Sequence, residues 1–303
     1  MNFLNLIRWK NLVMIALVQL LIKYALLEPF GVQTSLDIFG ITLLISATLC
    51  IAAAGNIIND VYDVETDFVN KPDRIIIGTF VSEKTAYNLF IIFNVIGVGI
   101  GYYVSYLVGK NAFFSLFVII SVLLYVYASY LKQTLVIGNV VISILVALSL
   151  IIVGIFELLP SITSLNRLTQ LTLFKIIFDY ALFAFSINLL REIAKDIEDI
   201  NGDYKAGMNT LPIAIGKSRA TNVLFVLSIL CLLFIVYYVI DSLYKNQIAV
   251  LYFLIFVIGP LLYTCIKIFS AKSKKDFHHI SNVLKLVMLF GMFSLLLYKY
   301  VLL

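Results

Sequence analysis

Polar residues at four-residue intervals are the feature of this sequence best suited to chemistry. In the segment NIINDVYDVETDFVN, Asn59, Asp63 and Asp67 follow one another at positions i, i+4 and i+8. On a helix each step of four residues turns by only about 40°, so the three side chains share one face. Carboxylates at this spacing repel each other, whereas a hard dication such as Mg²⁺ attracts them and is typically shared with substrate phosphates. The spacing therefore predicts a magnesium site for a phosphorylated substrate.

A second acidic segment, REIAKDIEDINGDYK, repeats part of this pattern with Asp199 and Asp203 at i and i+4. Basic residues are interleaved with both segments: Lys71, Arg74, Arg191, Lys195 and Lys205. Two facing carboxylate sets with Mg²⁺ and nearby cations would bind a diphosphate, because metals bridge carboxylate to phosphate and Lys or Arg neutralises the remaining charge. The alternative is that these acids are solvated helix ends, which explains one such segment better than two with matching spacing.

The elements that must position these residues are membrane-spanning helices. Hydrophobic residues make up 62% of the 303 residues and charged residues 13%, with mean hydropathy +1.04. A soluble domain carries about 25% charged residues, so the composition predicts an all-α integral membrane protein with a single domain over residues 1–303. The apolar runs do not alternate as barrel strands would. They predict nine spans: 11–30, 38–58, 86–108, 112–131, 135–157, 172–191, 220–240, 247–269 and 281–302.

Basic residues predict the orientation of these spans. With the N-terminus in the cytoplasm, sixteen of the 22 Lys and Arg residues fall on the cytoplasmic side, as the positive-inside rule requires. Both acidic segments then lie in long cytoplasmic loops, roughly 59–85 and 192–219, of a multi-pass protein of the cell (plasma or inner) membrane. The loops are four spans apart, which predicts two similar halves, about 11–131 and 135–269, followed by a ninth helix. The net charge of +5 is too small and scattered for a nucleic-acid-binding protein.

With these motifs in place, the sequence resembles the UbiA-type intramembrane prenyltransferases. That family carries Asn-x-x-x-Asp-x-x-x-Asp after its second helix and Asp-x-x-x-Asp after its sixth. Asn59, Asp63 and Asp67 match the first motif, Asp199 and Asp203 match the second, and the segment YKAGMNTLPIAIG resembles the sequence that follows it in the family. The resemblance covers essentially the whole chain.

The resemblance implies nine helices around a lipid-open cavity capped by the two acidic loops. It also implies a Mg²⁺ cofactor and a polyprenyl diphosphate donor, whose diphosphate leaves so that a lipophilic acceptor in the bilayer attacks the allylic carbocation. The catalytic set it implies is Asp63, Asp67, Asp199 and Asp203, and Asn59 joins these four as a metal ligand. Apolar spans rich in Phe and Tyr would hold the prenyl tail and exclude water.

Further cations are candidates for binding the substrates. Lys132, at the end of the fourth span, either lies near the diphosphate or is an interfacial lysine that extends toward water. Arg8 and Asn11 either reach the acceptor's head group or anchor the N-terminus. The full substrate-binding prediction comprises Asn59, Lys71, Arg74, Lys132, Arg191, Lys195, Lys205, Arg8 and Asn11.

The acceptor is the open part of this prediction. The segment KDIEDINGDYKAGMNTLP most resembles the family branch that prenylates glycerol phosphate ethers, which favours a prenylated glycerol phosphate. The alternative acceptor is an aromatic quinone precursor such as 4-hydroxybenzoate or a naphthoate. A cation-coupled transporter is the alternative from a different class, but it would place acidic residues in the middle of broken helices, whereas here they cluster at one face.

Overall fold

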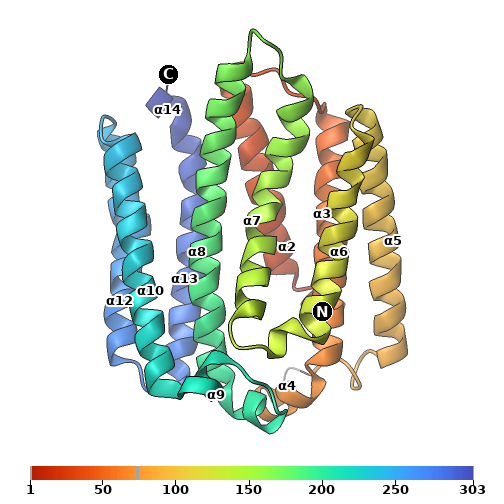
Figure 1. Ribbon diagram of the computed structural model, residues 1–303, viewed down its shortest axis with the longest axis vertical. Coiled ribbons are helices and arrows are strands. Elements are labelled where there is room, and N and C mark those ends of the chain that lie inside the picture. The colour runs from red at the N-terminus through yellow and green to blue at the C-terminus, as the bar shows by residue number, and fades with distance from the viewer. Residues whose placement is uncertain (1, 73–74, 303) are drawn as a thin grey trace.

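The computed structural model describes residues 2–72 and 75–302, and these are almost entirely helical (Figure 1). Within them no β-strand forms; the nearest feature is an isolated bridge between Ile77 and Val81. Nine helical segments of the described chain are long and apolar enough to cross a membrane: Trp9–Phe30, Ile38–Tyr62, Glu83–Leu107, Asn111–Ser129, Ile137–Ser161, Arg167–Lys205, Lys217–Leu243, Gln247–Ser270 and Lys274–Tyr300. The predicted all-α membrane fold with nine spans is therefore confirmed.

The α-helices that make up these spans are α2 (Trp9–Leu21), α3 (Ile38–Tyr62), α5 (Glu83–Leu107), α6 (Phe114–Ser129), α7 (Ile137–Glu157), α8 (Arg167–Lys205), α10 (Lys217–Tyr238), α11 (Gln247–Phe253), α12 (Gly259–Ser270) and α13 (Lys274–Phe293). Short helices outside this set are α1 (Asn2–Leu6), α4 (Val64–Asn70), α9 (Leu211–Ile215) and α14 (Tyr298–Leu302). Three spans contain a π-helical turn, at Ile22–Leu27, Val239–Leu243 and Leu254–Ile258. Short 3₁₀ turns are Glu28–Phe30, Asn111–Phe113, Leu131–Gln133, Leu159–Ser161 and Ser294–Leu297.

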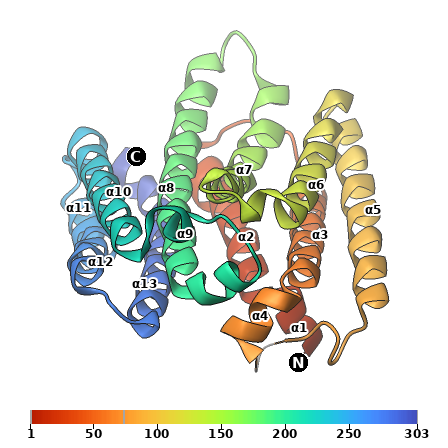
Figure 2. The ribbon, with the colours of Figure 1, turned by 60° about the horizontal axis from the view of Figure 1, so that its bottom comes forward.

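The helices form one bundle around two central members. Helices α2 and α7 lie in the middle, with α3, α5 and α6 on one side and α8, α10, α12 and α13 on the other (Figures 1 and 2). The first half-repeat thus lies largely on one side and the second on the other. The internal similarity of the two halves stays a prediction.

Helix α8 is much longer than a membrane span. Its 39 residues extend about 58 Å, whereas the hydrocarbon core of a bilayer is about 30 Å thick. The prediction that a loop begins at residue 192 is wrong, because the helix continues through Asp199 and Asp203 to Lys205. No proline interrupts this stretch, and the Glu192–Lys195 ion pair supports it one turn apart, at 2.8 Å.

The predicted loop 59–85 also contains a helix, α4, whose first residue follows Asp63. Figure 2 shows α4, α9 and the end of α8 together at the end of the bundle where the acidic motifs lie. The end of the bundle that carries the two acidic motifs is therefore built from the ends of α3, α4 and α8. Each motif lies on helical backbone and not on an irregular loop.

The length of α8 makes the topology testable. We expect cysteines placed at Lys205 and Lys274 to react with a membrane-impermeant maleimide from one face, and a cysteine at Arg167 to react only from the other, because a single helix separates residues 167 and 205. The background replaces Cys50, Cys231 and Cys265 by Ser. Labelling of positions 167 and 205 from the same face contradicts the nine-span arrangement.

Candidate active site

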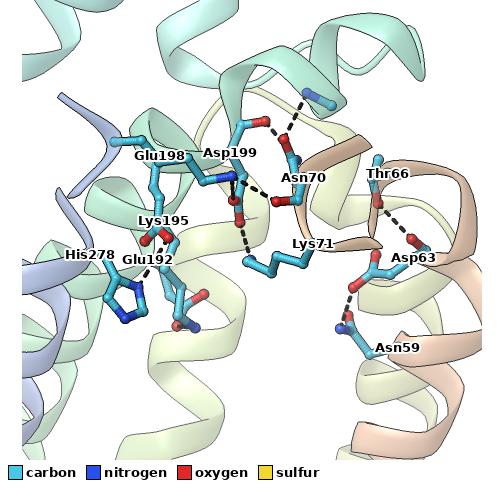
Figure 3. A network of polar contacts seen from close by, with 12 residues as sticks. Asn59, Asp63, Thr66, Asn70, Lys71, Glu192, Lys195, Glu198, Asp199 and His278 are labelled. Carbon is cyan, nitrogen blue, oxygen red and sulfur yellow. Dashed lines mark hydrogen bonds and ion pairs between the residues drawn. The ribbon is translucent and has the colours of Figure 1, made fainter. Parts of the chain in front are cut away.

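The first motif lies where α3 meets α4. Asp63 is the residue between the two helices, and its backbone N–H bonds to the carbonyl of Asn59 at 3.0 Å, while that of Asp67 bonds to the carbonyl of Asp63 at 2.8 Å. The four-residue spacing of the motif is thus preserved across the junction. The side chains of Asn59 and Asp63 are both buried, and the Asn59 amide donates to Asp63 Oδ2 at 2.7 Å (Figure 3).

The second motif is bonded to Asn70 and Lys71, which directly follow the first motif. Lys71 Nζ pairs with Asp199 Oδ2 at 2.5 Å, and the Asn70 amide bridges the backbone of α8 (Figure 3). Asn70 Nδ2 donates to the Asp199 carbonyl at 2.9 Å, and its Oδ1 accepts from the Gly202 N–H at 3.1 Å. The structure therefore brings the two motifs together, although they are about 130 residues apart in the chain.

Oxygen atoms of both motifs are buried without hydrogen-bond partners in the described chain. They are Asn59 Oδ1, Asp63 Oδ1 and Asp199 Oδ1. Buried polar atoms are normally satisfied, and these three are the hard oxygen donors that Mg²⁺ takes. Among the described residues no three His, Cys, Asp or Glu side chains already converge into a closed metal site. An open site suits Mg²⁺, since it usually keeps several waters and shares substrate phosphates.

Cations lie against these carboxylates. Lys132, on the 3₁₀ turn Leu131–Gln133, forms an ion pair with Asp63. Burial alone would lower the pKa of Lys132, but the Asp63 carboxylate outweighs this and raises the pKa above its usual value. Burial raises the pKa of Asp67, and the negative charge of Asp63 raises it further. The carboxylate cluster thus disfavours its own charge unless a cation is bound nearby.

A cavity adjoins the first motif, and we call it the motif cavity. Its empty volume is about 1110 Å³ including its mouth, and it lies between α2, α3, α6, α7 and α8. Polar and charged lining residues include Asn59 and its neighbour Asn56, and most of the other lining side chains are apolar, such as Ile51, Phe117 and Leu145. The predicted site residues among its lining are Arg8, Asn11, Asn59, Arg191 and Lys195.

Not every predicted binding residue joins this arrangement. Lys205 ends α8 with an exposed side chain, and it is not among the residues that line the motif cavity. Arg8 lines the motif cavity but pairs with Asp60 at 2.7 Å. Lys195 and Arg191 both contact Glu192. Arg74 lies outside the described residues.

The structure also adds residues that sequence reasoning missed. Lys274, at the start of α13, donates to the Asn70 carbonyl at 2.8 Å and lies 3.8 Å from Asp199 Oδ1. His278, one turn further along α13, contacts Glu198 at 3.1 Å. Both come from the ninth span, about 75 residues after the second motif, and no spacing rule links them to it. Gly202 lies within the second acidic segment, but nothing in the sequence marks it as the point of contact with Asn70.

Gly202 leaves room for the Asn70 side chain to pack against α8. A Cβ atom there would lie 2.2 Å from Asn70 Nδ2, so Gly202→Ala should displace the Asn70 amide. We expect turnover to fall by roughly tenfold, equivalent to about 1.4 kcal/mol, as the second motif shifts from the first. Asn70→Ala should have a similar effect, and the double variant should be no worse than either alone, because all three lose the same contact. If the double variant loses the sum of the two single losses in steady-state rate, the contact between Asn70 and Gly202 does not have this role.

The chain is thus a membrane-embedded helical bundle with a cluster of carboxylates and lysines beside a mainly apolar cavity. The sequence pattern of the UbiA prenyltransferase family matches residues 16–289, and the chain belongs to that family. It is therefore a membrane prenyltransferase, as the motifs predicted.

Three relatives illustrate the similarity. The digeranylgeranylglyceryl phosphate synthase of Methanosphaera stadtmanae is 32% identical over 83% of this chain and 86% of its own. The digeranylgeranylglyceryl phosphate synthase of Methanococcoides burtonii is 30% identical over 97% of this chain and 98% of its own. The solved structure of a UbiA homolog from Archaeoglobus fulgidus bound to GPP and Mg²⁺ has a TM-score of 0.62, 16% identity, and coverage of 98% of this chain and 99% of its own. At that identity the last comparison shows the shared fold.

Proposed function

We propose that this prenyltransferase moves a geranylgeranyl-type group from its diphosphate to a glycerol phosphate that already carries one prenyl ether. The observation that carries the proposal is the set of buried, unpartnered oxygens from two motifs that Lys71 and Asn70 hold together. The acceptor is supported by the relatives' name, since digeranylgeranylglyceryl phosphate bears two prenyl groups and its synthase must add one of them.

In the proposed reaction the allylic C–O bond to the diphosphate breaks, and the electron pair leaves with the diphosphate. The acceptor's hydroxyl oxygen then bonds to the allylic carbon, and the hydroxyl proton is released, so that the products are an ether, diphosphate and a proton. Bound Mg²⁺ would supply positive charge for the leaving diphosphate. We propose Asn59, Asp63, Asp67, Asp199 and Asp203 as the residues that hold it.

The chain's own residues have separable roles in this proposal. Lys132 and Lys71, which pair with Asp63 and Asp199, lie where they can take phosphate charge once the carboxylates bind metal. The apolar wall of the motif cavity holds the donor's prenyl chain and keeps water from the carbocation. Aromatic side chains such as Phe117 and Tyr127 offer ring faces that stabilise a cation.

The proposed orientation places the N-terminus and both acidic motifs in the cytoplasm. The support is the asymmetry of Lys and Arg between the two faces. In this orientation a diphosphate head group would reach the site from the cytoplasmic side of the membrane.

An acceptor panel tests the proposed function. Purified protein in lipid nanodiscs would receive labelled geranylgeranyl diphosphate with one acceptor at a time: geranylgeranylglyceryl phosphate, 4-hydroxybenzoate or a dihydroxynaphthoate. We expect product only with the glycerol phosphate ether. Product with an aromatic acceptor and none with the ether overturns the acceptor assignment while leaving the family's reaction type intact.

A further inference from the structure

A second cavity lies on the other side of α2 and α7 from the motif cavity. It is enclosed by α2, α7, α8, α10 and α13 together with the π-turn Leu254–Ile258, and its empty volume is about 960 Å³ including its mouth. Most of its wall is apolar, with side chains such as Met14, Phe183 and Met288. Both cavities lie between helices of the bundle and are lined mainly by apolar side chains. The bundle therefore has two cavities whose walls suit an apolar chain.

The two cavities share part of their walls. Six residues from three helices line both: Asn11, Ile15, Val146, Ser149, Asn188 and Arg191. Molecules bound in the two cavities would therefore meet along α2, α7 and α8. Asn11 donates its backbone N–H to the carbonyl of Arg8, which pairs with Asp60 beside Asn59, and Arg191 contacts Glu192, another residue of the motif cavity. Two substrates with head groups near these residues would bring their reacting atoms together.

The second cavity shares Arg191 with the motif cavity, but its charged lining residues are all cations. Arg191 and Lys285 are its two charged lining residues, and no carboxylate is found among the described residues that line it. Lys285 Nζ donates to Asn11 Oδ1 at 2.7 Å, and Arg191 Nε is buried with no hydrogen-bond partner within the described chain. Two cations at the end of an apolar cavity suit an anion that carries a long apolar chain.

We propose that the second cavity binds the acceptor: Arg191 and Lys285 hold its phosphate, and the apolar wall holds the prenyl chain that it already carries. The donor's chain occupies the motif cavity, so the acceptor's hydroxyl approaches the allylic carbon across the shared wall. This assignment rests on the proposed function, because it takes the acceptor to be a once-prenylated glycerol phosphate. It adds Lys285 to the binding residues and gives each prenyl chain its own cavity.

Gly291 provides a substitution that fills the second cavity without disturbing the fold. It lines that cavity on α13, and an added Cβ would meet no atom within 4 Å. Leu is also a better helix former than Gly. Gly99→Leu is the matched control, because Gly99 is an exposed glycine of α5 whose Cβ would also meet no atom within 4 Å, and it lines neither cavity.

We expect Gly291→Leu to raise the acceptor's KM by about tenfold or more and to leave the donor's KM within about twofold, the pattern of lost ground-state binding of one substrate. For an acceptor that carries a geranyl chain in place of a geranylgeranyl chain, the same substitution should raise KM much less. Gly99→Leu should match wild type for both substrates. A larger effect on the donor, or an unchanged acceptor KM, overturns the assignment.

Photo-cross-linking gives a second readout that does not require turnover. An acceptor analogue with a diazirine at the end of its prenyl chain should label α13 or α8 near Met288 and Phe183, and unlabelled acceptor should suppress this labelling. Labelling of α3 or α6 around Ala52 and Phe117, in the motif cavity, overturns the assignment. Wild-type protein that makes no ether from any glycerol phosphate acceptor overturns the proposed function and this assignment with it, whereas ether formation with labelling in the motif cavity overturns the assignment alone.

Discussion

Asp63→Asn should lower turnover by at least about a hundredfold, the loss typical of removing one preorganised charge-stabilising group from an active site. Asp63 is buried between the Asn59 amide and the ammonium of Lys132, and its Oδ1 has no hydrogen-bond partner. Asn keeps the shape of the side chain but removes its negative charge and leaves Lys132 unpaired. Asp199→Asn should act similarly, because its carboxylate pairs with Lys71 and its Oδ1 is also unpartnered.

Glu65→Gln is the matched control for these variants. Glu65 lies on α4 two residues after Asp63, but its side chain is exposed. Its removal should change kcat by less than about twofold, since surface substitutions away from the site are nearly neutral. Single-turnover rates, with gel-filtration profiles to show that each variant is folded, provide the measurement. Wild-type rates in Asp63→Asn would remove this residue from the catalytic set.

Lys23→Met should destabilise the fold by about 3–5 kcal/mol, because it leaves the buried carboxylate of Glu157 without a partner. Lys23 and Glu157 form an ion pair at 3.0 Å, with side chains only 3% and 0% exposed. Lys23 Nζ also donates to the Leu36 carbonyl at 2.7 Å, and Glu157 Oε2 accepts from the Leu36 N–H at 3.2 Å. The pair ties the second half of the first span to the end of α7, far along the chain from the acidic motifs.

Removing both charges separates the pair's own effect from that of an unpaired charge. Lys23→Met combined with Glu157→Met should recover much of the lost stability, since replacing a buried ion pair by apolar groups is often nearly neutral. Lys245→Met, at an exposed lysine, should leave stability within about 0.5 kcal/mol of wild type. Thermal unfolding in detergent would compare the four proteins. A Lys23→Met protein as stable as wild type contradicts a structural role for the pair.

The fold could be predicted because each span carries its own signal. Twenty apolar residues cannot cross a membrane except as a helix with all its backbone groups paired, so nine runs predicted nine spans. The positions at which helices end could be predicted less well. The polarity of the segment around Asp199 and Asp203 predicts a loop, but a helix that leaves the membrane becomes polar without ending, as α8 does.

The site could be predicted as residue types but not as contacts. Asn59 and Asp63 were predicted from spacing, since i and i+4 positions on one helix are neighbours whatever the tertiary structure. Lys274 and Lys285 belong to a distant helix, and only tertiary packing brings them to Asp199 and Asn11. The division of the interior into two cavities depends on the positions of α2 and α7, which hydropathy does not report.

Product formation with and without Mg²⁺ is the most direct test of the proposed metal-dependent prenyl transfer. Purified protein in nanodiscs would receive geranylgeranyl diphosphate and geranylgeranylglyceryl phosphate, in buffer with Mg²⁺, with EDTA, and with EDTA followed by excess Mg²⁺. We expect one diphosphate to be released for each ether formed, as detected by mass spectrometry. We expect no product in EDTA and recovery when Mg²⁺ is restored, because the paired carboxylates and the diphosphate otherwise repel each other. Ether formation at the full rate in EDTA would contradict the proposed metal dependence.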